Sequence, residues 1–165
     1  MLSTKRLLLR GPQPSELTAT FAAYSDPMTM RFWSTAPHEN IDVTREKLAW
    51  RIEDFAKHPR NFEIILDGDW VGHAGMYRDF EVGFMLSRAN WRQGIISEAM
   101  HAIIPHLLET IRVPYMTADV DPLNVASCGI LRKLGFHETH RAENTFCINN
   151  HWSDSVYYRL DPPKI

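Results

Sequence analysis

The sequence predicts an α+β fold, in which about four helices flank a mixed sheet. Strand-like and helix-like apolar patterns follow one another in the order β-α-α-β-β-β-α-β-α-β-β. The chain has 165 residues, 44% of them hydrophobic, so it can bury a core of its own. No tract of linker composition interrupts it, and we expect residues 1–165 to form a single domain.

The N-terminal third is expected to supply one strand and two helices. The apolar run in KRLLLRG has the length of a strand and ends at Gly11 and Pro12. Two helices with one apolar face each follow, the second over residues 43–57 and ended by Pro59. Their expected buried positions are Leu17, Phe21 and Tyr24 in the first helix and Leu48, Ile52 and Phe55 in the second.

Three consecutive strands and the strongest helical pattern occupy the middle of the chain. Asp67 and Gly68 separate two β-prone runs and predict a hairpin turn, and EVGFML reads as the third strand. The helix that follows has a long apolar stripe, formed by Met100, Ile103, Ile104, Leu107, Leu108 and Ile111. Pro105 lies inside this pattern and should bend the helix, because proline lacks a backbone donor.

The C-terminal third begins with a strand pattern in YMTADV. A helix should then start at Asn124, which can cap it, and stop at Gly135. The tail NTFCINNHWSDSVYYRL reads as two strands joined near Asn149 and Asn150. A nucleotide-binding fold of Rossmann type is disfavoured, because it requires strands and helices in alternation.

Composition excludes several functional classes. The net charge of −2 and the pI near 6.4 argue against a nucleic-acid-binding protein. No apolar run reaches the length of a membrane span, and none resembles a signal peptide. The two cysteines, Cys128 and Cys147, cannot form a disulfide framework, so we expect a cytoplasmic protein. His137 and His140 do not have the spacing of a zinc helix, and we expect no metal site.

The stretch WRQGIISEAM, residues 91–100, places one glycine at the start of the strongest helix. A helix N-terminus has unpaired amide groups and partial positive charge, and glycine lets an anion approach them. The stretch therefore suits a phosphate group, with Arg92 adding charge and Ser97 a hydroxyl. It lacks the Gly-Lys-Ser/Thr of a P-loop and the three glycines of a dinucleotide fingerprint. A plain strand-to-helix turn is the alternative interpretation.

Two motifs in sequence order resemble the acyl-CoA-binding core of the GNAT N-acetyltransferases: EVGFML…ANWRQGIISEAM, then NVASCGILRKLGF. The segments STKRLLLRGPQPSE and HWSDSVYYRL make the chain similar to the RimJ/RimL-type branch, which acetylates ribosomal-protein N-termini. The resemblance extends over nearly the whole chain. It implies an α/β/α arrangement around a mostly antiparallel sheet that is splayed into a V, with acetyl-CoA bound in the cleft.

The resemblance also assigns coenzyme contacts. The pantetheine arm would pair with the backbone of the central strand at Phe84, Met85 and Leu86. The diphosphate would lie on the turn and helix start, on Arg92, Gln93, Gly94, Ile95, Ile96 and Ser97. Asn124 would bond the pantetheine arm, with a helix cap as its alternative role. Ile96 departs from the family pattern of Gly or Ala, and its branched side chain is expected to crowd the phosphates.

Two catalytic candidates follow from the same resemblance. Ser127 matches a serine that protonates the departing thiolate, with a hydroxyl bonded to its own helix as the alternative. The tyrosine that many members use is Leu131 here. Glu81 lies where some members keep a general base, with a purely structural glutamate as the alternative. The glutamate base of the RimL enzymes corresponds to Phe146 and cannot be carried over.

The function implied is acetyl-CoA-dependent transfer of an acetyl group to a primary amine, by direct attack on the thioester. The amine acceptor, a protein N-terminus or a small molecule, stays open. So does the oligomeric state, with a homodimer among the alternatives. A sensor that binds acyl-CoA without turnover is the competing reading. His73 is expected to be packed rather than to act as a base. Aromatic residues that could line an acceptor pocket, or simply the core, are Phe32, Trp33, Trp50 and Trp70.

Overall fold

The structure is a computed structural model that describes residues 1–162. Its strands are β1 (Leu2–Ser3), β2 (Leu7–Arg10), β3 (Asn61–Leu66), β4 (Asp69–Arg78), β5 (Glu81–Leu86), β6 (Met116–Val120), β7 (His137–Ile148) and β8 (His151–Leu160). Its α-helices are α1 (Leu17–Ser25), α2 (Ile41–Lys57), α3 (Ile95–His106) and α4 (Val125–Lys133). The predicted order of elements is confirmed, with the two-residue strand β1 as an addition.

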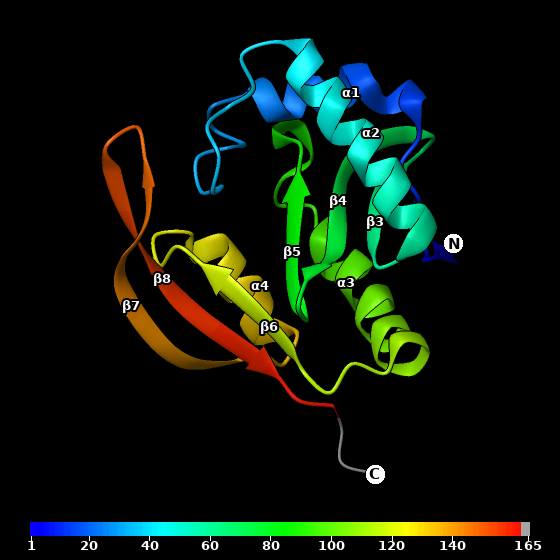
Figure 1. Cartoon of the computed structure of the whole chain (residues 1–165). Helices are drawn as coiled ribbons and strands as arrows, with labels where there is room; N and C mark the ends of the chain where they lie inside the picture. The colour runs from blue at the N-terminus through cyan, green and yellow to red at the C-terminus, as the bar shows by residue number, and fades with distance from the viewer. Residues whose placement is uncertain (163–165) are drawn as a thin grey trace.

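One mixed sheet runs through the molecule, with the strand order β1-β2-β3-β4-β5-β6-β8-β7 (Figure 1). All neighbouring strands are antiparallel except β5 and β6. These two are parallel and joined through α3, as a parallel pair requires a crossover. They pair at Glu81 and Thr117 alone and then diverge, so the sheet opens into two arms (Figure 1). The predicted α+β fold is confirmed.

Helices cover both faces of the arm built from β1 to β5. α1 and α2 lie on one face and α3 on the other, while α4 lies against the arm of β6 to β8 (Figure 1). The larger core cluster joins α3 and α4 to the sheet, and its apolar groups include Ile64, Ala74, Met100, Ile103 and Leu131. A smaller cluster packs beneath α1 and contains Tyr24, Trp70 and Met85.

The stripe predicted for α3 is largely confirmed. Met100, Ile103, Ile104 and Leu107 are buried, whereas Ile111 is 38% exposed. After Pro105 the helix changes type, since a π-helical turn, η3 (Leu107–Ile111), follows α3.

The inward faces of α1 and α2 differ from the predicted apolar stripes. Buried residues of α1 are Thr20, Ala23 and Tyr24, and those of α2 are Thr44, Leu48 and Arg51. Arg51 forms a 2.6 Å ion pair with Glu63 of β3, which also accepts a hydrogen bond from Trp70 Nε1. Helix periodicity assigns faces by hydropathy, so it misplaces a helix whose inward group is a paired charge.

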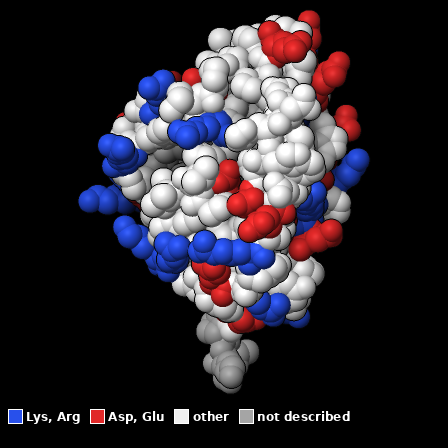
Figure 2. Space-filling view, turned by 90° about the vertical axis from the view of Figure 1, so that its left-hand side faces the viewer, with Lys and Arg blue, Asp and Glu red and all other residues white. Residues whose placement is uncertain are grey.

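Within residues 1–162 no helix is both long and apolar enough to span a bilayer. Nor do these residues contain a group of three or more His, Cys, Asp or Glu side chains placed to hold a metal ion. Lys, Arg, Asp and Glu side chains are interspersed among uncharged atoms on the side of the molecule drawn in Figure 2.

Candidate active site

The turn between β5 and α3 ends on a left-handed glycine. Gly94 has φ 74° and ψ 8° and is the N-cap of α3. The first bond of the helix runs from Glu98 N–H to the Gly94 carbonyl, at 3.0 Å. The preceding helical amides, those of Ile95, Ile96 and Ser97, therefore have no partner one turn back. Glycine has no side chain to cap them, so they are free to bind an anion.

Three side chains hold this turn in place. Trp91 Nε1 donates to the Leu86 carbonyl at 2.8 Å, and Gln93 Nε2 donates to the Ala89 carbonyl at 3.3 Å. Arg6 Nη2 donates to the Gln93 carbonyl at 3.0 Å. The turn thus has a defined conformation before any ligand binds, which lowers the entropic cost of binding.

The expected crowding of the turn by Ile96 does not occur. Its side chain is 6% exposed and packs in the larger core cluster, together with Ile95 at 1%. Only the main chain of these two residues is left to face an anion. The side chains of Arg92 and Gln93 are exposed, and that of Ser97 is half-buried.

The diverging edge of β5 offers backbone groups to the space between the arms. The Phe80 carbonyl accepts from Thr117 N–H at 2.9 Å, so it points toward β6. Alternate residues of a strand direct their N–H and C=O groups to the same side, which places those of Phe84 and Leu86 on the open side. Met85 directs its groups toward β4, where it pairs with His73. Of the three residues predicted to pair with pantetheine, Phe84 and Leu86 thus face the gap, although the Leu86 carbonyl already accepts from Trp91 Nε1.

Asn124 caps α4. Its Oδ1 accepts from Ser127 N–H at 3.2 Å, which is the alternative role considered for this residue. Its amide Nδ2 remains a donor for another partner. Ser127 is half-buried, and within residues 1–162 its hydroxyl forms no hydrogen bond, so it is not occupied by its own helix. The neighbouring Cys128 is buried in the core.

Glu81 lies at the point where β5 and β6 part. It pairs with Thr117 and is half-buried. Burial raises the pKa of Glu81, opposed by Arg78, whose Nη2 lies 3.7 Å from Oε1, and aided by the charge of Asp119. A carboxyl with a raised pKa is better matched to proton transfer near neutral pH than an ordinary one.

Asp119 of β6 is a functional candidate that the sequence analysis missed. It stands two residues after Thr117, so its side chain lies on the same face of the sheet as Glu81. Burial raises the pKa of Asp119, although the hydroxyl of Ser155 and the positive charge of Arg78 act in the opposite direction. The available signal was an acidic residue inside the strand pattern YMTADV.

His73 is packed, as expected. It has no exposed surface, and its Nε2 lies 2.9 Å from the Tyr24 hydroxyl and its Nδ1 2.6 Å from that of Tyr77. Burial holds the pKa of His73 well below its usual value, so the ring is neutral, with one nitrogen donating and the other accepting. The Trp33 ring contacts Tyr24, His73 and Tyr77.

This aromatic cluster, Tyr24, Trp33, His73 and Tyr77, reaches the middle of β5. The Tyr77 ring lies 2.9 Å from the place that a Cβ on Gly83 would take, so it covers the strand there. Of the other two tryptophans considered for an acceptor pocket, Trp50 is 59% exposed, and Trp70 is buried in the smaller core cluster together with Tyr24.

Comparisons with known proteins agree with this geometry. The sequence model of the family described as "Acetyltransferase (GNAT) domain" matches residues 6–137. The Bacillus subtilis (strain 168) protein named "Uncharacterized N-acetyltransferase YnaD" is 24% identical over 166 residues, which cover 96% of this chain and 95% of that protein.

Solved structures share the fold. One described as an acetyltransferase of the GNAT family from Bacillus anthracis has a TM-score of 0.87 at 22% identity, covering 97% of both chains. The RimL ribosomal L7/L12 α-N-protein acetyltransferase in complex with coenzyme A has a TM-score of 0.84 at 16% identity. That superposition covers 96% of this chain and 95% of the other. With a family match over most of its length and this shared fold, the chain belongs to the GNAT acetyltransferase family.

Proposed function

We propose that residues 1–165 form a single GNAT domain that is an acetyl-CoA-dependent N-acetyltransferase of the RimJ/RimL type. The observation that carries this proposal is the run of uncapped amides at Gly94, Ile95, Ile96 and Ser97, beside the unpaired edge of β5. An anion-binding helix start next to an open strand edge suits a ligand with a diphosphate at one end and an amide-bearing arm at the other. Coenzyme A has both parts. Both cysteines are free, which fits a cytoplasmic protein.

In this proposal each part of the site has one task. The amides of the Gly94 turn bind the diphosphate, and Arg92 adds a full positive charge. The backbone of Phe84 and the N–H of Leu86 pair with the pantetheine arm, since the Leu86 carbonyl already accepts from Trp91, and Asn124 Nδ2 donates to the arm. Acetyl-CoA supplies the thioester carbonyl that the amine attacks.

Glu81 is the proposed general base. It takes the proton of the incoming ammonium group, directly or through one water, and burial has already raised its pKa. Ser127 is the proposed general acid, since its unengaged hydroxyl can donate to the departing thiolate sulfur. A backbone N–H on the open edge of β5 stabilises the negative charge that develops on the thioester carbonyl oxygen during the attack.

The acceptor is proposed to be a cationic amine that enters along the arm of β7 and β8. A surface cavity of about 300 Å³ there is lined by Pro122, Arg141, Ala142, Glu143, Asp154 and Ser155. Ser155 also acts on the pKa of Asp119, and the charge of Asp119 acts on that of Glu81, so the cavity shares one lining residue with the surroundings of the two carboxylates. Carboxylates at the end of the path attract an ammonium group. RimL is described as an α-N-protein acetyltransferase, and we extend that acceptor class to this chain as a proposal.

The test is thiol release from acetyl-CoA with a panel of peptides and small amines, beside calorimetric titration with CoA. Release that depends on one class of amine supports the transferase, with Ser127→Ala lowering kcat and Glu81→Gln removing the acid limb of its pH profile. Tight binding without release for any amine would favour the acyl-CoA sensor. Full activity in the variant that carries both substitutions would refute both catalytic assignments.

A further inference from the structure

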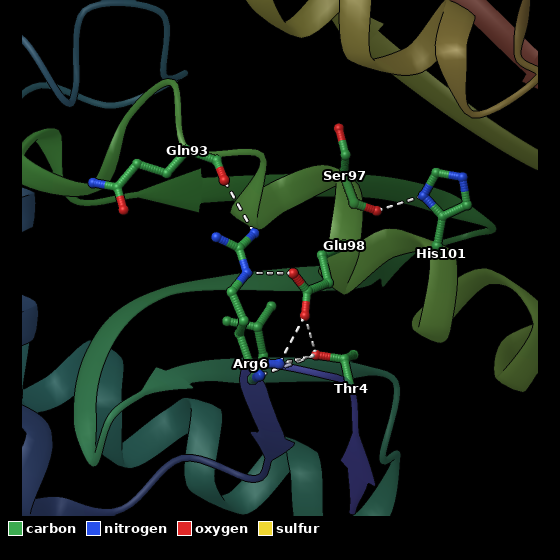
Figure 3. Close-up of polar contacts among 7 residues, drawn as sticks. Thr4, Arg6, Gln93, Ser97, Glu98 and His101 are labelled. Atoms are coloured by element: carbon green, nitrogen blue, oxygen red, sulfur yellow. Dashed lines mark hydrogen bonds and ion pairs between the residues drawn. The ribbon is translucent and has the colours of Figure 1, made fainter.

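We infer that Arg6 is a positioning residue of the coenzyme turn, so that the N-terminal hairpin of β1 and β2 forms part of the coenzyme site. The inference rests on the proposed function, because it takes the Gly94 turn to be the diphosphate site. Arg6 is 87 residues before Gln93 in the sequence, yet its guanidinium contacts the turn directly (Figure 3).

The contacts join the hairpin to the end of the turn and to the first turn of α3. Arg6 Nη2 donates to the Gln93 carbonyl at 3.0 Å, and Arg6 Nε donates to Glu98 Oε2 at 2.7 Å. The Arg6 N–H donates to Glu98 Oε1 at 3.0 Å, and the Thr4 hydroxyl donates to the same oxygen at 2.5 Å (Figure 3). One guanidinium thus spans the last residues of the turn and the first turn of α3.

The bond to Gln93 sets the direction of the next amide. In a trans peptide unit the C=O and N–H groups point in opposite directions. Because the Gln93 carbonyl points at Arg6, the Gly94 N–H points away from Arg6. Gly94 can rotate more freely than any other residue, so without this bond its peptide plane is the least constrained in the turn.

The contacts with Glu98 offset a negative charge near the turn. Glu98 lies in the first turn of α3, where its carboxylate would repel a bound diphosphate. Arg6 and Thr4 engage both of its oxygens and hold them on the hairpin side. The Thr4 hydroxyl and the Arg6 donors keep the pKa of Glu98 below its usual range. Arg6 offsets this charge and orients the Gly94 amide at the same time.

A plain surface ion pair is the competing explanation, since the Arg6 side chain is 41% exposed and that of Glu98 21%. The two explanations differ in which part of the coenzyme they affect. A positioning residue for the diphosphate alters the binding of CoA but not of pantetheine, which lacks the diphosphate. A merely structural ion pair alters thermal stability and leaves both dissociation constants unchanged.

The experiment measures dissociation constants of CoA by calorimetry and of pantetheine by competition, for the wild type, Arg6→Ala, Arg6→Lys and Lys5→Ala. Lys5 is an exposed cation beside Arg6, with no hydrogen bond or ion pair within residues 1–162, so it is the matched control for charge. Arg6→Ala should raise the Kd of CoA about tenfold and leave that of pantetheine unchanged. Arg6→Lys should raise it by about threefold, because an ammonium keeps the charge but lacks the guanidinium fork.

An equal effect of Arg6→Ala and Lys5→Ala on CoA would reduce the role of Arg6 to net charge and overturn the inference. An equal loss for CoA and pantetheine would overturn it as well, since the damage would then extend beyond the diphosphate end. If Arg6→Ala did not fold, Arg6→Lys alone would decide by the same comparison. A wild type that binds no CoA would reject the proposed function itself, and the inference with it.

Discussion

Replacing Gly94 with alanine isolates the effect of the left-handed N-cap, because the backbone conformation is what opposes the change. An added Cβ would meet only Arg6 Nη2, at 3.8 Å, so there is room for it. The left-handed conformation costs alanine about 1–2 kcal/mol. The smaller entropy of its unfolded chain returns about 0.4–1 kcal/mol. We expect a net loss of about 1 kcal/mol in the free energy of unfolding.

Gly129→Ala is the matched control for this substitution. Gly129 lies inside α4, and an added Cβ there meets nothing within 4 Å. Because glycine in a helix is less stable than alanine by roughly 0.5–1 kcal/mol, this variant should gain stability. The two Gly→Ala changes are thus expected to have opposite signs.

The assay is urea unfolding followed by circular dichroism, with calorimetric titration of CoA on each variant. Gly94→Ala should also weaken CoA, because the methyl group alters the amides proposed to hold the diphosphate, while Gly129→Ala should leave the Kd unchanged. A Gly94→Ala protein as stable as Gly129→Ala would refute the reasoning on backbone conformation. Unchanged CoA binding in Gly94→Ala would place the diphosphate away from this turn.

Two further predictions concern buried and half-buried charges. Glu63→Gln should lower the free energy of unfolding by about 3–5 kcal/mol, because it leaves Arg51 buried without its partner. The exposed residue Glu39 is the control, and Glu39→Gln should change the free energy of unfolding by less than about 0.5 kcal/mol in the same urea titration. Equal losses of unfolding free energy in the two variants would contradict the role given to the Arg51–Glu63 ion pair. Asp119→Asn should lower the pKa of Glu81 and move the acid limb of kcat/KM to lower pH. A carboxyl group whose pKa is raised in the folded state stabilises the protein at pH values below its unfolded-state pKa. This stabilisation is lost as the pH rises through the folded-state pKa. As the pH rises through the folded-state pKa, the free energy of unfolding should therefore fall less in Asp119→Asn than in the wild type. If the pH profiles of kcat/KM and of the free energy of unfolding were both unchanged, they would argue against the electrostatic coupling of Asp119 and Glu81.

Local sequence patterns were sufficient to predict the strands, the helices and the glycine turn before α3. The series Met100, Ile103, Ile104 and Leu107 predicted the buried face of α3, and a lone glycine before it marked the start of the helix. Both depend on spacing within one element, which hydropathy and glycine chemistry express directly.

Contacts between distant segments were outside the reach of such patterns. The inward side of α2 carries Arg51, because Glu63 of β3 lies across from it. Ile96 was expected to crowd the turn, but the helix rotates its side chain into the core. Arg6 and Asp119 gave little sign of a role, since their partners lie far along the chain or on another strand.

The sequence by itself determined the order of strands and helices, the position of the glycine turn and the resemblance that pointed to the family. These follow from residue types at short spacing, where each side chain's preference acts on its own backbone. Only the tertiary structure decided which groups share the site. It separates β5 from β6 beyond Glu81 and Thr117, and it directs the backbone of Phe84 and Leu86 toward the gap. It also brings the N-terminal hairpin to the turn, where Arg6 donates to the Gln93 carbonyl. The reason is geometric, because hydrogen bonds and charge pairs act over a few ångströms, and folding brings together groups that the sequence separates.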